Sequence, residues 1–186
     1  MDWFLSKTIA VSIRTEKIQR IRFCVRSDCR IVQMRELTEE LEAEFVNLHG
    51  RVLRLIEEYS FEDLFSQVTG KESENPGMLL VRSAALVEQC FVGITTRLWD
   101  DPFEWTLRES FHNAEQVSAY FSEVEQAREN GFAHFQSDAD LRKHIPSPAG
   151  MHTVFAIVIR SLIEAENYLL LARDRIARGA EPSKVQ

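Results

Sequence analysis

The chain has 186 residues, a length that fits a single domain of ordinary size. Hydrophobic residues make up 45% of it and charged residues 27%, a mixture that excludes an intrinsically disordered chain. The formal net charge of −7 does not favour a nucleic-acid partner, and three cysteines without a Cys-x-x-Cys pair suit a reducing compartment better than a disulfide scaffold.

Residues 1–35 differ in charge from the rest of the chain. They hold eight Lys or Arg and three Asp or Glu, a net charge of +5, which leaves −12 for the remainder. Apolar and basic side chains alternate over residues 20–26, which is the period of a β-strand, but one strand without partners is not a stable unit. We expect a loosely attached extension, strand-like or disordered. It is either a basic arm for an acidic partner or a translated upstream region whose true start is Met34.

The first predicted helix begins at Glu36, where the hydrophobic period becomes helical. Apolar residues recur at spacings of three and four up to Tyr59, and acidic residues fill much of the other face. This pattern predicts an amphipathic helix of about six turns. Ser60 and Asp63 form a capping pair that opens a short turn, and residues 69–77 are expected to form a loop.

The second predicted helix begins at Asn75 and Pro76, because asparagine is a good helix cap and proline fits the first turn. Its apolar stripe continues to Leu98, and Ser83 and Cys90 lie on the same face. The helix is expected to end before "RLWDDPFEW", a stretch rich in aromatic residues and turn formers.

A third predicted helix starts near Asn113, whose partner Gln116 completes a possible capping box, and Gly131 marks its break. The segment "KHIPSPAG", residues 143–150, follows it. It predicts a rigid, extended connection, because each proline disfavours helix for the residue before it.

The fourth predicted helix follows Thr153, which can cap it, and runs to about Arg178. Four helices joined by irregular loops, with no convincing sheet, imply an all-α fold. We expect a four-helix bundle over residues 36–178, followed by a tail at residues 179–186.

No segment is expected to span a membrane. The most apolar stretch, residues 154–172, carries Arg160, Glu164, Glu166 and Asn167, and charged groups are costly in lipid. We therefore expect a cytoplasmic protein.

Four short pieces of sequence carry a further indication. They are "LRLIEEYSFEDLF" in the first predicted helix, "LLVRSAALVEQCF" in the second, the linker "WDDPFEWTLRE", and "IPSPAG" before the fourth. In this order and spacing they resemble the DinB/YfiT-like superfamily over roughly residues 36–178. The resemblance implies a bundle that holds a divalent metal through one histidine on the second helix and a His-x-x-x-His pair on the fourth, used in relatives for thiol transfer or hydrolysis. It also supports the expectation of a homodimer.

The histidines that the resemblance implies are missing from the matching positions. These positions are Ser83 in the second helix and Glu164 and Tyr168 in the fourth, where no histidine occurs. Glu164, with Glu88 or Glu166 turned inward, could hold Mg²⁺ or Ca²⁺ weakly, whereas Zn²⁺ and Ni²⁺ prefer imidazole or thiolate. We therefore expect a degenerate metal site and no resident cofactor.

Aromatic and polar residues suggest a pocket. Trp99 and Trp105, with Glu88 and Glu166, could line it, or the aromatic residues could instead plug one end of the bundle. Cys90 is expected to be a small core residue, because no base is implied near it.

His134, His144 and His152 lie near one another in sequence and could form a second metal site, although such residues are more often solvated loop side chains. Glu164 is expected to be exposed or paired with Arg160, because burying a lone carboxylate is unfavourable. The leading interpretation is a DinB-like bundle that binds a small molecule or a protein without catalysis. The alternative is a metal-dependent transferase or hydrolase with unusual ligands.

Overall fold

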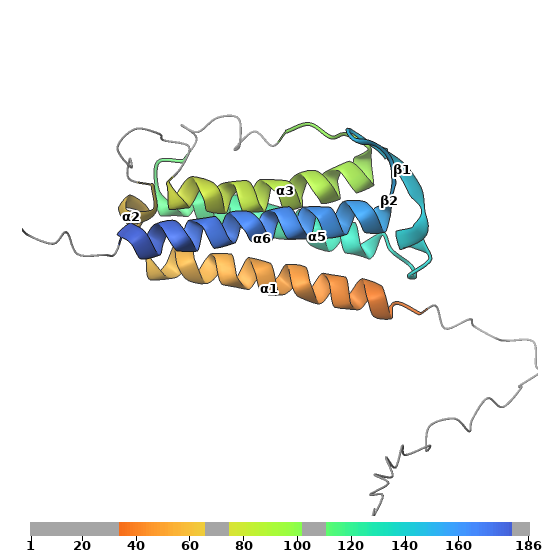
Figure 1. Ribbon diagram of the computed structural model, residues 1–186, viewed down its shortest axis with the longest axis horizontal. Coiled ribbons are helices and arrows are strands. Elements are labelled where there is room, and N and C mark those ends of the chain that lie inside the picture. The colour runs from red at the N-terminus through yellow and green to blue at the C-terminus, as the bar shows by residue number, and fades with distance from the viewer. Residues whose placement is uncertain (1–33, 66–74, 102–110, 180–186) are drawn as a thin grey trace, which may run out of the picture. The chain divides into compact units, whose positions relative to one another are not determined.

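The computed structural model describes residues 34–65, 75–101 and 111–179, and these residues are predominantly helical (Figure 1). The expected all-α character is therefore confirmed. Residues 1–33, most of the expected C-terminal tail, and Trp105 lie outside the described residues, so the predictions made for them remain predictions.

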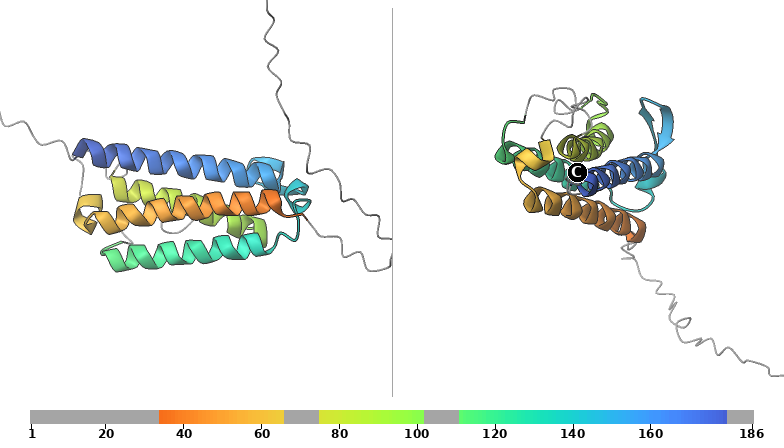
Figure 2. Two further views of the ribbon diagram at one scale, coloured as in Figure 1. Left: turned by 90° about the horizontal axis from the view of Figure 1, so that it is seen from below. Right: turned by 60° about the vertical axis from the view of Figure 1, so that its left-hand side comes forward.

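Four long helices lie side by side in the described part of the chain (Figures 1 and 2). They are α1 (Glu36–Glu58), α3 (Pro76–Thr96), α5 (Ala114–Ala133) and α6 (Val154–Gly179). The smaller elements are the helix α2 (Phe61–Phe65), the 3-10 turn η3 (Asp140–Arg142) and the strands β1 (His144–Ser147) and β2 (Gly150–Thr153). Helix α3 packs most extensively against α6 and next against α5, which makes it the central helix.

Side chains just ahead of the helices determine where several of them begin. Each accepts a hydrogen bond from a backbone N–H in the first turn that has no partner within the helix. The pairs are Ser60 with Asp63, Asn75 with Met78, Asn113 with Gln116 and Thr153 with Ala156, at 2.8–3.1 Å. The predicted starts of α2, α3, α5 and α6 are confirmed.

The connection at residues 143–150 is not the unpaired extension that the sequence predicts, because its strand β1 pairs with β2 in an antiparallel hairpin. Ile145 pairs with His152, and Ser147 with Gly150. Gly150 has a φ of +111°, which side chains other than glycine rarely allow, and the Ser147 hydroxyl donates to its carbonyl at 2.8 Å. The prolines do exclude helix here, but the tight turn folds the chain back before it enters α6.

Aromatic rings from three helices form the centre of the core. Phe45 of α1, Phe91 of α3 and Phe132 of α5 are almost fully buried, and the Phe91 ring lies 5.1 Å from Phe45 and 4.9 Å from Phe132 between centroids. A Cβ at Gly131 would lie 2.3 Å from the Phe91 ring. The expectation that Gly131 breaks the third helix is wrong, because α5 continues to Ala133 and the glycine allows α5 to approach α3 closely.

Helix α3 is the one helix of the described residues that is long and apolar enough to cross a membrane. Of its most apolar window, 72% is buried inside the structure. Its position between α5 and α6 accounts for its apolar character, since a central core helix is hydrophobic on most of its surface.

Candidate functional site

The positions matched to metal ligands include Ser83, which joins two helices instead. Ser83 is 1% exposed, and its hydroxyl donates a 2.9 Å hydrogen bond to the carbonyl of Ala165 on α6. Ser161 of α6 makes the reciprocal bond, from its hydroxyl to the carbonyl of Leu86 at 3.0 Å. These small side chains let α3 and α6 approach closely, and their bonds lie where the resemblance implies an ion.

Glu164 and Tyr168 do not meet Ser83 at a common site. Glu164 is exposed, as expected, and lines a surface cleft, whereas Ser83 lines a separate interior cavity. Tyr168 is partly buried, and the Arg82 guanidinium lies over its ring, 5.9 Å from the centroid. A hydroxyl bonded to a carbonyl, a carboxylate at another surface and a phenol beneath a cation do not fit a transition-metal ion.

The carboxylates considered for a pocket have protein partners. Glu88 accepts a 2.9 Å hydrogen bond from the Tyr120 hydroxyl, and Glu166 forms an ion pair with Arg51. Trp99, by contrast, does line the surface cleft. No group of three His, Cys, Asp or Glu side chains among the described residues is placed to hold a metal ion.

The interior cavity lies between α1, α3 and α5 and has a volume of about 20 Å³, room for about one water molecule. Its lining is apolar except for Ser83 and the side chains of His49, Glu125 and Arg128. Burial lowers the pKa of His49, so its imidazole is neutral at pH 7. A cavity of this size does not admit a substrate.

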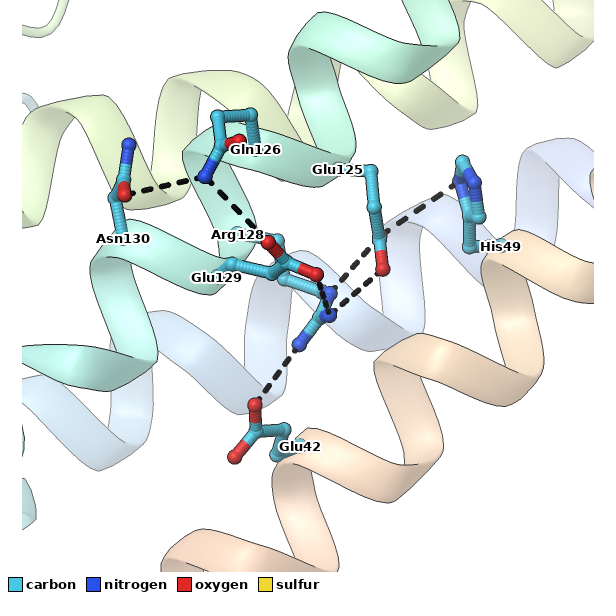
Figure 3. A network of polar contacts seen from close by, with 7 residues as sticks. All are labelled: Glu42, His49, Glu125, Gln126, Arg128, Glu129 and Asn130. Atoms are coloured by element: carbon cyan, nitrogen blue, oxygen red, sulfur yellow. Dashed lines mark hydrogen bonds and ion pairs between the residues drawn. The ribbon is translucent and has the colours of Figure 1, made fainter.

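Arg128 is the centre of a polar network beside this cavity (Figure 3). It is 3% exposed, and its guanidinium bonds both carboxylate oxygens of Glu125, at 2.9 and 2.7 Å, and one of Glu42 at 3.2 Å. Burial alone would raise the pKa of Glu125, but the hydrogen bonds from Arg128 outweigh it and lower the pKa. The network keeps Glu125 and Arg128 charged and ties α5 to α1 through Glu42, which is a structural role.

The surface cleft is the larger hollow, with a volume of about 270 Å³. It lies where the end of α3, the hairpin and the first half of α6 meet, at one end of the helices (Figure 1). Its apolar lining includes Leu86, Trp99, Ala156 and Ile157, and its polar lining includes Gln89, His152, Arg160 and Glu164.

Trp99 is held in the wall of this cleft by residues of α3. Arg97 ends the helix with a left-handed φ of 67°, which turns the chain back toward α3. A Cβ at Gly93 would lie 2.2 Å from the indole ring, so glycine is needed there. The Gln89 side chain donates to the Asp101 carboxylate at 3.0 Å and to the Trp99 carbonyl at 3.4 Å, which fixes the returning segment.

The side chains of the cleft that could react are poorly activated for catalysis. Cys90 is buried, as expected, and burial raises the pKa of its thiol to about 12 against the opposing hydrogen bond of Ser161, so it is not a nucleophile at neutral pH. His152 lies with Nε2 3.2 Å from the Ala149 carbonyl. Of the three histidines considered for a second metal site, only His152 is among the cleft residues.

The sequence predicts Trp99 as a pocket residue, and Trp99 does line the cleft. It predicts Glu164 only as a metal-site position, and it does not indicate that Gln89 and Arg160 line the cleft. A cation and an anion four residues apart on one helix are the signal that points to this surface. Comparisons of the chain with protein-family models, curated proteins and solved structures found no match. A functional assignment therefore depends on the geometry of the two hollows.

Proposed function

We propose that the chain is a DinB-like four-helix bundle without the metal site, and that it binds a small molecule in the surface cleft without catalysis. The observation that carries the proposal is the cleft itself, with a volume of about 270 Å³, an apolar lining and charged residues. Small-molecule sites have this composition, and the volume lies near the lower end of their range.

The groups that line the two hollows support binding better than catalysis. The Cys90 thiol is buried and has a pKa of about 12, so it stays protonated at neutral pH. The hydroxyls of Ser83 and Ser161 donate to backbone carbonyls, so neither is activated as a nucleophile. The His49 Nδ1 lies 3.9 Å from a carboxylate oxygen of Glu125, but His49 borders a cavity that holds about one water molecule.

The proposal includes a reducing, cytoplasmic location and a homodimer. A buried free thiol at Cys90 suits a reducing compartment. Among the large apolar side chains exposed on α6, those of Ile163, Leu170 and Leu171 support a contact with a second copy.

A matched pair of substitutions tests whether ligands use the cleft. Ala156→Trp places an indole in the cleft, and Ala119→Trp places the same side chain on the exposed face of α5 as a control. A library of small fragments is screened against the wild type by protein-observed NMR. We expect the ligands found to bind the Ala119→Trp variant as they bind the wild type, and to be lost from Ala156→Trp. A library without ligands, or ligands that bind both variants equally, would contradict the proposal.

A further inference from the structure

We infer that the cleft binds a small zwitterion with an apolar body, such as an apolar α-amino acid. The inference rests on the proposed small-molecule function and adds the charge pattern of the ligand. Arg160 binds the carboxylate of the ligand, Glu164 binds its ammonium group, and the body lies against Trp99 and Ile157.

Arg160 and Glu164 carry opposite charges but do not form an ion pair with each other. Both are exposed, they stand four residues apart on α6, and neither forms an ion pair within the described residues. On the same helix Asp174 and Arg178, also four apart, pair at 2.7 Å. The order of the charges accounts for the difference, because an acid before a base pairs better at this spacing than a base before an acid.

The spacing of Arg160 and Glu164 suits the two charged groups of an amino acid. Four residues advance a helix by about 6 Å. A carboxylate and an ammonium group on one carbon atom, each with a charge-assisted hydrogen bond of about 2.8 Å, can span such a gap. A guanidinium binds a carboxylate through two parallel hydrogen bonds, and the Glu164 carboxylate accepts hydrogen bonds from an ammonium group.

The same two charges discriminate against ligands with one charge. A carboxylate without an amine is attracted by Arg160 and repelled by Glu164, and an amine without a carboxylate meets the opposite pair of effects. A zwitterion is attracted by both residues. The balance of +1 and −1 at this part of the cleft therefore selects a ligand with no net charge but two charged groups.

The apolar part of the lining determines the body of the ligand. Leu86, Ala156, Ile157 and Trp99 line the cleft that Arg160 and Glu164 border, so an aliphatic or aromatic body is buried on binding. The indole Nε1 of Trp99 is buried and has no hydrogen-bond partner among the described residues, so Trp99 offers the cleft its apolar ring.

A set of ligands with one common body tests the inference. Titrations followed by NMR at low salt would compare L-phenylalanine with 3-phenylpropanoate, phenethylamine and 2-phenylethanol, and would include L-leucine as an aliphatic zwitterion. We expect an amino acid to bind about tenfold more tightly than either singly charged compound. Arg160→Gln should weaken the amino acid and strengthen phenethylamine, while Glu164→Gln should weaken the amino acid and strengthen 3-phenylpropanoate. Both residues are exposed, so these substitutions leave the core intact.

Three results would overturn the inference, and they can be told apart. In the first result, neither amino acid binds, or all compounds bind equally, but the Ala156→Trp variant still loses the fragments. The inferred zwitterionic ligand is then wrong, and the cleft remains a binding site. If no compound of either set binds the wild type, the inference and the proposed function are both wrong. Retention of amino-acid binding in the Arg160→Gln and Glu164→Gln variants would also overturn the assigned roles.

Discussion

The carboxylate of Asp138 caps the start of α1 by accepting hydrogen bonds from Thr38, at 2.9 Å from its backbone N–H and at 2.8 Å from its hydroxyl. The N–H of Leu37 donates to the same carboxylate at 3.2 Å. Arg35, which precedes α1, supplies no side-chain cap. Asp138 therefore satisfies backbone donors that the helix leaves free, and it places a negative charge at the positive end of the helix dipole.

Replacement of Asp138 by Ala should lower the melting temperature by several degrees. The substitution leaves two backbone N–H groups of α1 without this acceptor and removes the side-chain link between α1 and the segment after α5, although the backbone hydrogen bond from Asp138 to Met34 remains. Asp100→Ala is the control, because Asp100 is exposed and its side chain makes no hydrogen bond in the described residues. Thermal unfolding followed by circular dichroism measures both. Equal melting temperatures for the two variants would contradict the capping role.

The effect of Asp138 should also depend on pH. Burial acts to raise the pKa of Asp138, but hydrogen bonds from Thr38 and Leu37, with Arg142 nearby, lower it overall. A carboxylate with a lowered pKa in the folded state adds stability above its ordinary pKa and loses it as the pH falls through the folded value. The difference in melting temperature between the wild type and Asp138→Ala should be constant near neutral pH and shrink below about pH 4. A difference that grows on acidification would contradict this mechanism.

Arg128→Met should destabilise the fold by about 2–3 kcal/mol, because it leaves Glu125 and Glu42 without their buried cation. The value is below that of a fully buried pair, since the two glutamate side chains keep 25% and 35% of their exposure. Arg178→Met is the matched control and should change stability by less than about 0.5 kcal/mol, because Arg178 and Asp174 are exposed. Urea unfolding measures both. Similar losses of unfolding free energy for the two variants would show that the network of Arg128 stabilises the fold no more than the exposed pair of Arg178 and Asp174.

Local signals explain why the helix starts could be predicted and one cap could not. Asn75 and Asn113 each bond a backbone N–H three residues later, so the pattern is visible in a short window of sequence. The cap from Asp138 to Thr38 joins residues 100 positions apart, and no local pattern indicates it. The hairpin was missed for a related reason, since the prolines of residues 143–150 indicate an extended chain but not its partner strand.

The candidate site also has some features that the sequence indicates and others that depend on how the helices pack. The absence of histidines in the fourth helix is read directly from the sequence, and the degenerate metal site inferred from it stays a prediction. The bond from Ser83 to Ala165 depends on how α3 and α6 pack, and residue types alone do not show it. The cleft requires the returning segment with Trp99 to meet α6 and the hairpin, so among its described lining residues only Trp99 is predicted as a pocket residue from the sequence.

The predicted homodimer can be tested on α6, where Ile163 and Leu170 are 55% and 53% exposed. A two-fold contact uses the same patch on both copies, so one charged substitution enters the interface twice. Light scattering should give the mass of two chains for the wild type and the 21.5 kDa of one chain for Ile163→Lys or Leu170→Lys. Ala119→Lys, on the exposed face of α5, is the control. A wild type that is monomeric at micromolar concentration would contradict the prediction.

We predict that the purified protein carries no stoichiometric Zn²⁺, Ni²⁺ or Fe²⁺, because of the residues at the positions matched to metal ligands. The Ser83 hydroxyl donates to a carbonyl, Glu164 lies at the cleft, and the Tyr168 ring lies beneath the Arg82 guanidinium, so no pair of these groups offers the ligands that such ions prefer. Elemental analysis after purification without a metal-binding tag measures the content. About one equivalent of metal that is lost in Glu164→Ala would contradict the prediction.

A variant designed to gain a metal site tests whether Ser83, Glu164 and Tyr168 converge. Ser83→His, Glu164→His and Tyr168→His together restore the three imidazoles that the family resemblance implies. Because Ser83 borders the interior cavity and Glu164 the surface cleft, we expect the folded triple variant to bind Zn²⁺ no more tightly than the double variant Glu164→His with Tyr168→His, whose two histidines share one helix face. Calorimetric titration with Zn²⁺ provides the measurement, and circular dichroism verifies the fold. Tighter binding of one equivalent by the triple variant than by the double variant would show that the three positions converge, and that the serine bonds between α3 and α6 close a site which histidines can open.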